Sequence, residues 1–435
     1  MATVSPRPPR ALRLRPFHAI RYAGATDRNL ADMLAPPYDV IDDDQRVALE
    51  SRDPHNVVRL ILPRDPAGAT QDDDRYTHAA AMMNRWLDDG VLAVDDRASL
   101  YIYQQRRGET VIQRGLFGAL LWQPLDAGVI LPHENVRSGP VEDRLALMRA
   151  MRANPEPIFL LYDGGGAATR ISEATVATEP VCSANAADGI THELWAISSP
   201  DEIAAIADDL DDRTAMIADG HHRYTTYGYL RDEMHAAGHG QGPWDYGLAL
   251  LVDDSVVTPD IKAIHRAIPG LSLSKAIDRA RVGFDVRELD AGTDVDAALA
   301  ELATCNGTAY VLTDGARFAL LSKPDNETLA AAKPVERTDA WWALDASVAS
   351  IFLMQHLFGV TDAAGEVEAE HDPQAALRLA RETNGVALLL NPAPLAGIMA
   401  VAEAGDAMPR KSTLFMPKPC SGLVMRGFRF ETGVD

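Results

Sequence analysis

The residues best suited to chemistry form the run ADGHHRY, residues 218–224. A short apolar strand is expected directly before this run and a helix directly after it. The first amides of a helix lack intrahelical partners and carry partial positive charge, and Gly220 lets a ligand approach the backbone closely. With further donors from His221, His222 and Arg223, the junction predicts a binding site for an anion or phosphate.

Asp219 is the unexpected member of this run, because a carboxylate beside a bound phosphate would repel it. It fits if a Mg²⁺ ion bridges Asp219 and the phosphate, or if Asp219 orients a nucleophile. In the simpler alternative, Asp219 only caps the helix and the histidines are solvated. Spacing alone leaves both interpretations open.

A second candidate is His133-Glu134-Asn135, at the end of another expected strand and ahead of Asp143-Arg144 at a helix start. A glutamate beside a histidine on a loop can act as a general base or metal ligand. The spacing does not match HExxH, which excludes a metalloprotease of that type. An exposed polar turn is the alternative.

A third candidate is Lys411-Ser412-Thr413 together with Lys418. The Lys-Ser/Thr pair is typical of the end of a phosphate-binding loop, but the GxxxxGK frame is missing, so a Walker site is excluded. The chain has only six lysines against 35 arginines. Two lysines within eight positions therefore favour a functional role, with a solvated surface as the alternative.

A fourth candidate is Tyr38-Asp39, which follows the paired prolines of Ala35-Pro36-Pro37. Paired prolines fix an extended segment and would present the two side chains rigidly. An ordinary rigid turn is again the alternative.

Composition limits the class of ligand. The chain of 435 residues is 47% hydrophobic and 24% charged, as expected for a globular protein of two or three domains. Asp and Glu outnumber Lys and Arg by 63 to 41, a net charge of −22. Such a surface repels an extended polyanion, so we expect no nucleic-acid partner, whereas a small phosphorylated ligand needs only one local positive pocket.

Three cysteines far apart in sequence favour a reducing cytoplasm over a disulfide framework. The most apolar run is far shorter than the roughly 20 residues of a membrane-spanning helix. We therefore expect a soluble, cytoplasmic protein without a membrane partner. The sequence does not indicate an oligomeric state.

Strands alternating with helices predict an α/β or α+β fold with mixed sheets and packed helices. Helices are expected over 76–89 and 141–151, a buried strand over 56–62, and a pair of strands over 100–104 and 114–121. We expect three segments: an N-terminal α/β region (1–125), a core with the HENV and DGHHR motifs (126–268), and a C-terminal α/β region (269–435).

The motifs APPYDVI, PHENV, ADGHHRY, LDASV and MPRKSTLFMPKPCSGL occur along the chain in this order. In this the chain closely resembles a family of bacterial and archaeal proteins, domain-of-unknown-function family ten-fifteen. The resemblance spans nearly the whole chain. It implies family membership but supplies no reaction.

The strand–DGHHR–helix element also resembles the signature box of the ParB/sulfiredoxin-like superfamily, which includes nucleotide-binding partition proteins and free-serine kinases. This resemblance implies a core of that type with N- and C-terminal additions. It also implies that Asp219 contacts a metal or the substrate hydroxyl, that residues 221–223 hold phosphates, and that Glu134 is the base. The 85 positions between Glu134 and Asp219 depart from the kinase pattern.

These observations predict a small-molecule phosphotransferase: a kinase of a hydroxy amino acid such as free serine, using Mg²⁺ and ATP or ADP. The alternatives are a nucleotide-responsive regulatory protein without turnover and a metal-dependent hydrolase. The expected catalytic residues are Glu134, Asp219 and His222, with Asp219 also the metal ligand. The expected binding residues are Gly220, His221, Arg223, Tyr38, Asp39, Asn135, Lys411, Ser412, Thr413 and Lys418.

Overall fold

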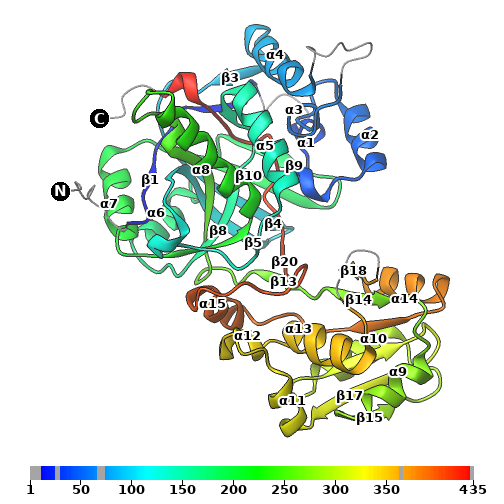
Figure 1. Ribbon diagram of the computed structural model, residues 1–435. Coiled ribbons are helices and arrows are strands. Elements are labelled where there is room, and N and C mark those ends of the chain that lie inside the picture. The colour runs from blue at the N-terminus through cyan, green and yellow to red at the C-terminus, as the bar shows by residue number, and fades with distance from the viewer. Residues whose placement is uncertain (1–10, 25–29, 66–73, 362–365, 432–435) are drawn as a thin grey trace. The chain divides into compact units, whose positions relative to one another are not determined.

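A computed structural model describes residues 11–24, 30–65, 74–361 and 366–431 (Figure 1). The chain divides into two compact units. The first comprises residues 1–132, 136–259 and 417–435, and the second comprises 133–135 and 260–416. The short C-terminal stretch therefore belongs to the same unit as the N-terminus.

A mixed sheet forms the centre of the first unit (Figure 1). Its strand order within the described residues is β6-β11-β8-β12-β5-β4-β10-β9, with β1 beside β5. The β11–β6 and β12–β8 pairs are parallel and the others antiparallel. The strands are β1 (Leu14–Arg15), β4 (Leu100–Arg107), β5 (Thr110–Leu121), β6 (Ile130–Leu131), β8 (Ile158–Tyr162), β9 (Cys182–Asn185), β10 (Ile190–Ile197), β11 (Ala215–Asp219) and β12 (Tyr246–Asp253).

The helices of the first unit bury apolar side chains against this sheet in one shared hydrophobic core. Helix α8, for example, contributes Tyr224, Tyr227, Leu230 and Met234 to that core. The helices are α1 (Leu30–Met33), α2 (Asp43–Arg52), α3 (Val58–Ile61), α4 (Arg75–Asp88), α5 (Ser138–Met151), α6 (Ala167–Thr175), α7 (Pro200–Leu210) and α8 (His221–Ala236).

A smaller sheet joins the two ends of the chain. Its order is β3-β2-β21-β7, formed by Leu92–Val94, Ala19–Tyr22, Met425–Gly427 and Ala153–Asn154. An isolated bridge between Ala35 and Ser421 continues the contact between the N- and C-terminal segments. These pairings bring the stretches around residues 38, 156 and 420 close together, although they are far apart in sequence.

The second unit is built on an antiparallel sheet of order β15-β17-β16-β19-β14-β18. Two clusters of buried apolar residues pack this sheet with its helices. The strands are Phe284–Glu288, Phe318–Pro324, Tyr310–Thr313, Val386–Leu389, His265–Ile268 and Glu368–Glu370 in that order. A separate pair joins β13 (Asp260–Lys262) to β20 (Leu414–Met416).

The second unit has seven α-helices among the residues that the structure describes. They are α9 (Leu273–Ala280), α10 (Val295–Ala303), α11 (Asn326–Ala332), α12 (Asp339–Trp342), α13 (Asp345–Val348), α14 (Pro373–Glu382) and α15 (Leu395–Glu403). Helix α13 continues as a π-helix over Ala349–Phe358.

The predicted α/β class with mixed sheets is confirmed, as are the helices near 76–89 and 141–151 and the β4–β5 pair. The strand predicted over 56–62 is wrong, because α3 occupies this stretch. The Asn56 side chain accepts from Val58 N and donates to Asp32 O and Leu34 O, which holds a buried helical turn. A fully buried apolar run shows no periodicity that distinguishes strand from helix.

The large sheet crosses the segment boundary predicted at residue 125, because β5 pairs with β12 in register from Gly115–Val252 to Leu121–Tyr246. The division into three segments itself stays a prediction. All three cysteines are free thiols. Among the described residues, no helix is both long enough and apolar enough to cross a membrane.

One packing constraint yields a stability prediction. An ideal Cβ at Gly247 of β12 would overlap the Tyr227 ring of α8. We expect Gly247→Ala to lower the free energy of unfolding, measured in urea, by about 1–3 kcal/mol, because overpacking displaces the ring. Gly139→Ala in α5, where a Cβ meets no atom within 4 Å, is the matched control and should not destabilise. Equal stability of wild type and Gly247→Ala would contradict this account.

Candidate functional site

The junction predicted from the sequence is present. Strand β11 ends at Asp219, Gly220 is the N-cap with φ 98°, and α8 begins at His221. A side chain at this left-handed position would be strained, and its Cβ would lie 3.1 Å from Ile158 Cγ2. The interpretation of Asp219 as the helix cap is therefore wrong, because Gly220 holds that position and the Asp219 carboxylate pairs with two cations.

The first of these cations is Lys418, which lies between two carboxylates. Its Nζ is 2.5 Å from Asp219 Oδ1 and 2.8 Å from Asp39 Oδ2. The side chains of Lys418 and Asp219 are 10% and 12% exposed, whereas that of Asp39 is 38% exposed. The bridge thus joins the N-terminal, central and C-terminal motifs of the sequence, and its Asp39 end faces solvent.

The charges of this bridge persist at neutral pH. Burial alone would raise the pKa of Asp219, but Lys418 and Arg223 outweigh it and lower the pKa below its ordinary value. Burial alone would lower the pKa of Lys418, but Asp219 and Asp39 outweigh it and raise the pKa. Both groups are therefore ionised over a wide range around pH 7.

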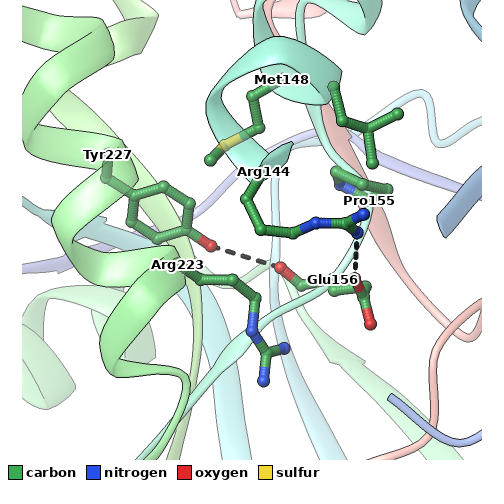
Figure 2. A pocket seen from close by; sticks show the side chains of 7 residues that line it. Arg144, Met148, Pro155, Glu156, Arg223 and Tyr227 are labelled. Atoms are coloured by element: carbon green, nitrogen blue, oxygen red, sulfur yellow. Dashed lines mark hydrogen bonds and ion pairs between the residues drawn. The ribbon is translucent and has the colours of Figure 1, made fainter. Parts of the chain in front are cut away.

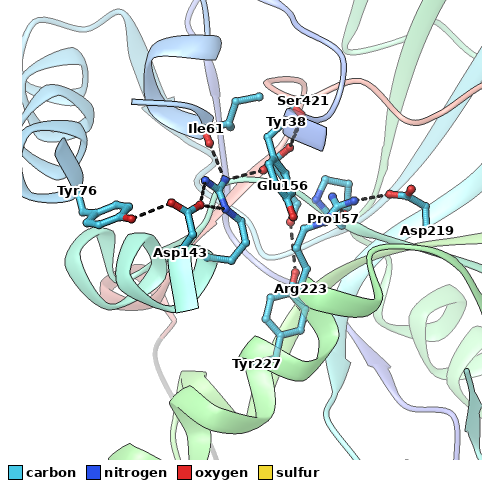
Figure 3. A network of polar contacts seen from close by, with 11 residues as sticks. Tyr38, Ile61, Tyr76, Asp143, Glu156, Pro157, Asp219, Arg223, Tyr227 and Ser421 are labelled. Atoms are coloured by element: carbon cyan, nitrogen blue, oxygen red, sulfur yellow. Dashed lines mark hydrogen bonds and ion pairs between the residues drawn. The ribbon is translucent and has the colours of Figure 1, made fainter. Parts of the chain in front are cut away.

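The second cation is Arg223, one turn along α8 from Asp219. Its Nη2 pairs with Asp219 Oδ2 and its Nη1 donates to Pro157 O. The side chain is buried, and the nearby charges of Asp219 and Glu156 raise its pKa despite the cost of burial. Arg223 thus fixes the orientation of Asp219 (Figure 3).

Glu156 is a central residue that the sequence analysis missed. It is 3% exposed, and its Oε1 accepts from Tyr38 N at 3.0 Å and from Ser421 Oγ at 3.2 Å. Its Oε2 lies 3.5 Å from Arg144 Nη1. Burial raises the pKa of Glu156, against the opposing effects of Arg223 and Arg144. One buried carboxyl therefore holds both terminal segments in place (Figure 3).

Arg144 extends the network towards α3 and α4. Its guanidinium stacks over the Tyr38 ring at 4.1 Å, donates to Ile61 O at 2.6 Å and pairs with Asp143. Asp143 also accepts from the Tyr76 hydroxyl at 2.7 Å (Figure 3). The cluster therefore alternates positive and negative groups, which offsets much of the cost of burying them.

A proline pattern marks the missed residue. Glu156 lies between Pro155 and Pro157, as Lys418 lies between Pro417 and Pro419. Tyr38 likewise follows two prolines. Since prolines fix an extended backbone, a charged residue flanked by them is held rigidly, and this shared signal could have pointed to Glu156.

The histidines of the junction differ in their environments. His221 is 5% exposed, which excludes the interpretation of both histidines as solvated. Backbone N–H of Arg137 donates to His222 Nε2 at 3.1 Å, so His222 is the neutral tautomer with its proton on Nδ1. Burial lowers the pKa of His222, which favours this neutral form.

The space beneath the junction is small. A cavity of about 10 Å³ is lined by Arg144, Leu147, Met148, Pro155, Glu156, Arg223 and Tyr227 (Figure 2). This is about the volume that one water molecule needs. The side of the cluster with Asp39 and His222, where α8 begins, is partly exposed.

The remaining predicted residues belong to the second unit. Glu134 and Asn135 follow His133, whose Nε2 lies 3.1 Å from Thr413 Oγ1. Met408 N also donates to His133 O at 2.9 Å. The structure thus brings the HEN motif (residues 133–135) and the RKST motif (residues 410–413) together within that unit.

The RKST stretch forms a tight turn. Ser412 Oγ donates to Pro409 O at 2.6 Å, and Lys411 has φ 50°. The buried Arg266 donates to the carbonyls of Arg410 and Lys411 at 3.1 and 3.0 Å. These contacts give Ser412 a structural role in the turn, and the binding and catalytic roles of this motif and of Glu134 stay predictions.

The predicted Mg²⁺ does not fit the Asp219 carboxylate as it is placed here. Mg²⁺ requires oxygen ligands in octahedral geometry, but Lys418 and Arg223 each take one carboxylate oxygen. Within the described ranges, no group of three or more His, Cys, Asp or Glu residues is arranged to hold a metal ion.

Comparison of the sequence with protein families gives a match to the model described as "Protein of unknown function (DUF1015)" over residues 14–347. The chain belongs to this family. The match includes the Tyr38-Asp39, HEN and DGHHR motifs and ends before Lys418. No curated protein matches the sequence.

Several solved structures are similar to this chain. A free serine kinase in complex with AMP is 14% identical, with TM-score 0.33, over 70% of this chain and 88% of the kinase. C-terminally truncated SbnI from Staphylococcus aureus is 12% identical, with TM-score 0.36, over 73% and 90%. A conserved hypothetical protein from Pyrococcus furiosus is 14% identical, with TM-score 0.33, over 73% and 97%.

The ion bridge can be tested by a double-mutant cycle. Lys418→Met leaves two carboxylates facing each other, and we expect a loss of about 3–5 kcal/mol in the free energy of unfolding. Asp219→Asn removes one of these carboxylates, so the double variant should be more stable than the sum of the single losses, with a coupling of about 1–3 kcal/mol. Urea unfolding measures all four proteins.

Lys262→Met is the control, because its pair with Asp260 is half exposed and should contribute little to stability. Additive losses in the cycle would show that Lys418 and Asp219 do not interact.

Proposed function

We propose that this protein binds a nucleotide at the Asp219–Lys418–Arg223 cluster and transfers a phosphoryl group to the hydroxyl of a small molecule such as free serine. The observation that carries the proposal is the Lys418 ammonium, shared between a buried Asp219 and a more exposed Asp39. An incoming phosphate can take the place of Asp39 at this ammonium without disturbing Asp219.

The surrounding donors suit a phosphate in that position. The first amides of α8 follow directly after Gly220, where a substituent-free backbone permits close approach. The neutral His222 keeps an Nδ1 proton, because its Nε2 already accepts from the backbone. Phosphoryl transfer depends mainly on positioning and charge neutralisation, which Lys418, these amides and His222 would supply.

Asp219 would orient the acceptor hydroxyl. Its lowered pKa makes it a weak base, so it can accept a hydrogen bond from the hydroxyl without removing the proton early in the reaction. Arg223 and Lys418 hold its two oxygens in a fixed direction. The roles predicted from the sequence for Glu134, Asn135, Lys411 and Thr413, which belong to the second unit, stay predictions. We place the reaction in the cytoplasm, in keeping with three free thiols.

A regulatory protein that binds a nucleotide without turnover is the second candidate. Two observations favour this candidate. The Asp219 carboxylate is paired with both Arg223 and Lys418, and the cavity beside Arg223 holds no more than about one water molecule. A site of this kind is stable without a substrate. A nucleotide that replaced Asp39 at Lys418 would then act by releasing the Tyr38-Asp39 segment.

The test is phosphoryl transfer from labelled ATP or ADP, supplied with Mg²⁺, to serine and other hydroxylated metabolites. We expect Asp219→Asn to lose at least about a hundredfold in turnover, since loss of one charge-stabilising or orienting group typically has this effect. Glu233→Gln, at the exposed pair with Arg149, is the control and should keep full activity. A folded Asp219→Asn enzyme with normal turnover would overturn the proposed role of Asp219.

The same assay separates the two candidates. A phosphoester product supports the kinase, whereas tight binding of nucleotide by the wild type without any product supports the regulatory protein. Absence of nucleotide binding by the wild type contradicts both.

The neutral state of His222 predicts a pH profile. Because burial lowers its pKa below the ordinary 6.5, His222 stays uncharged at all higher pH values, and its neutral form is lost only as the pH falls through the lowered pKa. We therefore measure the ratio of the ADP affinities of the wild type and His222→Gln, because titration of the ADP phosphates affects both proteins equally and cancels in the ratio. This ratio should be constant from about pH 7 to 9. A titration of that ratio within this range would contradict the assignment.

A further inference from the structure

Two glutamines of the central sheet hold the segment that carries Lys418. Gln105 of β4 and Gln113 of β5 are directly paired across the strands, and both are nearly fully buried. Gln113 Nε2 donates to Pro417 O at 2.8 Å, and Gln105 Nε2 donates to Lys418 O at 3.3 Å. Two neighbouring side-chain amides thus bind two successive carbonyls of the chain.

The sequence of the held segment explains why amide donors are needed. Lys418 lies between Pro417 and Pro419, and neither proline has a backbone N–H. The segment can therefore be fixed mainly through its carbonyl oxygens, which require donors from elsewhere. The prolines also restrict the backbone, so binding two carbonyls sets the direction of the Lys418 side chain.

The anchoring continues beyond the prolines. Cys420 N donates to the Tyr103 hydroxyl of β4 at 3.4 Å, and Ser421 Oγ donates to Glu156 at 3.2 Å. The backbone on the C-terminal side of Lys418 is thereby tied to the same sheet and to the buried carboxyl of the site.

The two glutamines carry a cost in stability. Neither Gln105 Oε1 nor Gln113 Oε1 has a hydrogen-bond partner in the part of the chain that the structure describes, and both atoms are buried. A buried acceptor without a partner is destabilising, and the hydrogen bonds donated to the Lys418 segment offset only part of this cost. Residues that bind Lys418 at the expense of stability are expected where function requires the position.

We propose that Gln105 and Gln113 are positioning residues, which hold Lys418 so that its ammonium meets both Asp219 and the anionic group of a ligand. This inference rests on the proposed function, because it assigns these glutamines to the same nucleotide site. They act through Lys418 and need not touch the ligand.

Gln113→Leu and Gln105→Leu test the proposal, with ADP as the probe in titration calorimetry and thermal unfolding measured on the same proteins. We expect affinity for ADP to fall at least tenfold in each variant. Each substitution also removes the side-chain donor of a carbonyl, so the melting temperature should fall, to about the same extent as in Gln123→Leu, in which Ala11 O loses its donor. Loss of ADP affinity in these two variants, but not in a comparably destabilised Gln123→Leu, is a result that a purely structural role does not produce.

Gln123→Leu is a closely matched control. Gln123 is also buried, its Nε2 donates to Ala11 O at 2.6 Å, and its Oε1 likewise has no partner among the described residues. It does not bind the Lys418 segment, so its replacement should leave ADP affinity unchanged.

Three outcomes would overturn the inference. If folded Gln113→Leu and Gln105→Leu bind ADP as tightly as the wild type, the two glutamines are not needed to position Lys418. Equal losses of affinity in Gln123→Leu show a general packing role. If the wild type itself binds no ADP, the proposed function fails, and the inference fails with it.

Discussion

The ion bridge at Lys418 is the interaction on which the site depends. One ammonium near the C-terminus pairs with Asp39 near the N-terminus and with Asp219 in the middle of the chain. This contact is possible only because the small sheet β3-β2-β21-β7 and the Ala35–Ser421 bridge already hold the two terminal segments together. The topology thus explains how three distant motifs form one cluster.

Burial decides how this cluster behaves. Buried charged groups are stable only when each has partners of opposite sign. Removal of one partner then lowers the stability of the fold more than replacement of all the charged groups by apolar residues. Glu156 supplies a negative charge to Arg144 and Arg223, and Asp219 pairs with Arg223 and Lys418. The exception is Asp39, whose carboxylate is partly solvated.

The sequence predicts the members of the cluster that carry recognisable motifs. Residue type and spacing single out five of them, and the structure places these five together: Tyr38, Asp39, Asp219, Arg223 and Lys418. Their contact could not be predicted, because it depends on strand pairings between segments more than 100 residues apart.

Other features were missed for definite physical reasons. Gln105 ends a run of buried residues in β4, and Gln113 lies between the partly buried Ile112 and Arg114 in β5. No regular alternation of buried and exposed residues therefore distinguishes either glutamine. Glu156 looks like a turn residue between prolines, and only its contacts with both terminal segments reveal its importance. The strand predicted over 56–62 is wrong, because Asn56 binds Asp32 O and Leu34 O at the start of a helical turn, and an apolar run in the sequence does not reveal these contacts.

In the proposed site, the Lys418 ammonium binds Asp219 and receives the anionic group of the ligand. Because the chain has only six lysines, labelling with ¹⁵N-lysine gives a simple spectrum in which the ammonium of Lys418 is identified by its loss in Lys418→Arg. We expect this signal to titrate above the ordinary lysine range, to shift in Asp219→Asn and to shift again when ADP is added. A Lys418 signal that titrates as an exposed lysine and does not respond to ADP would contradict this role of Lys418.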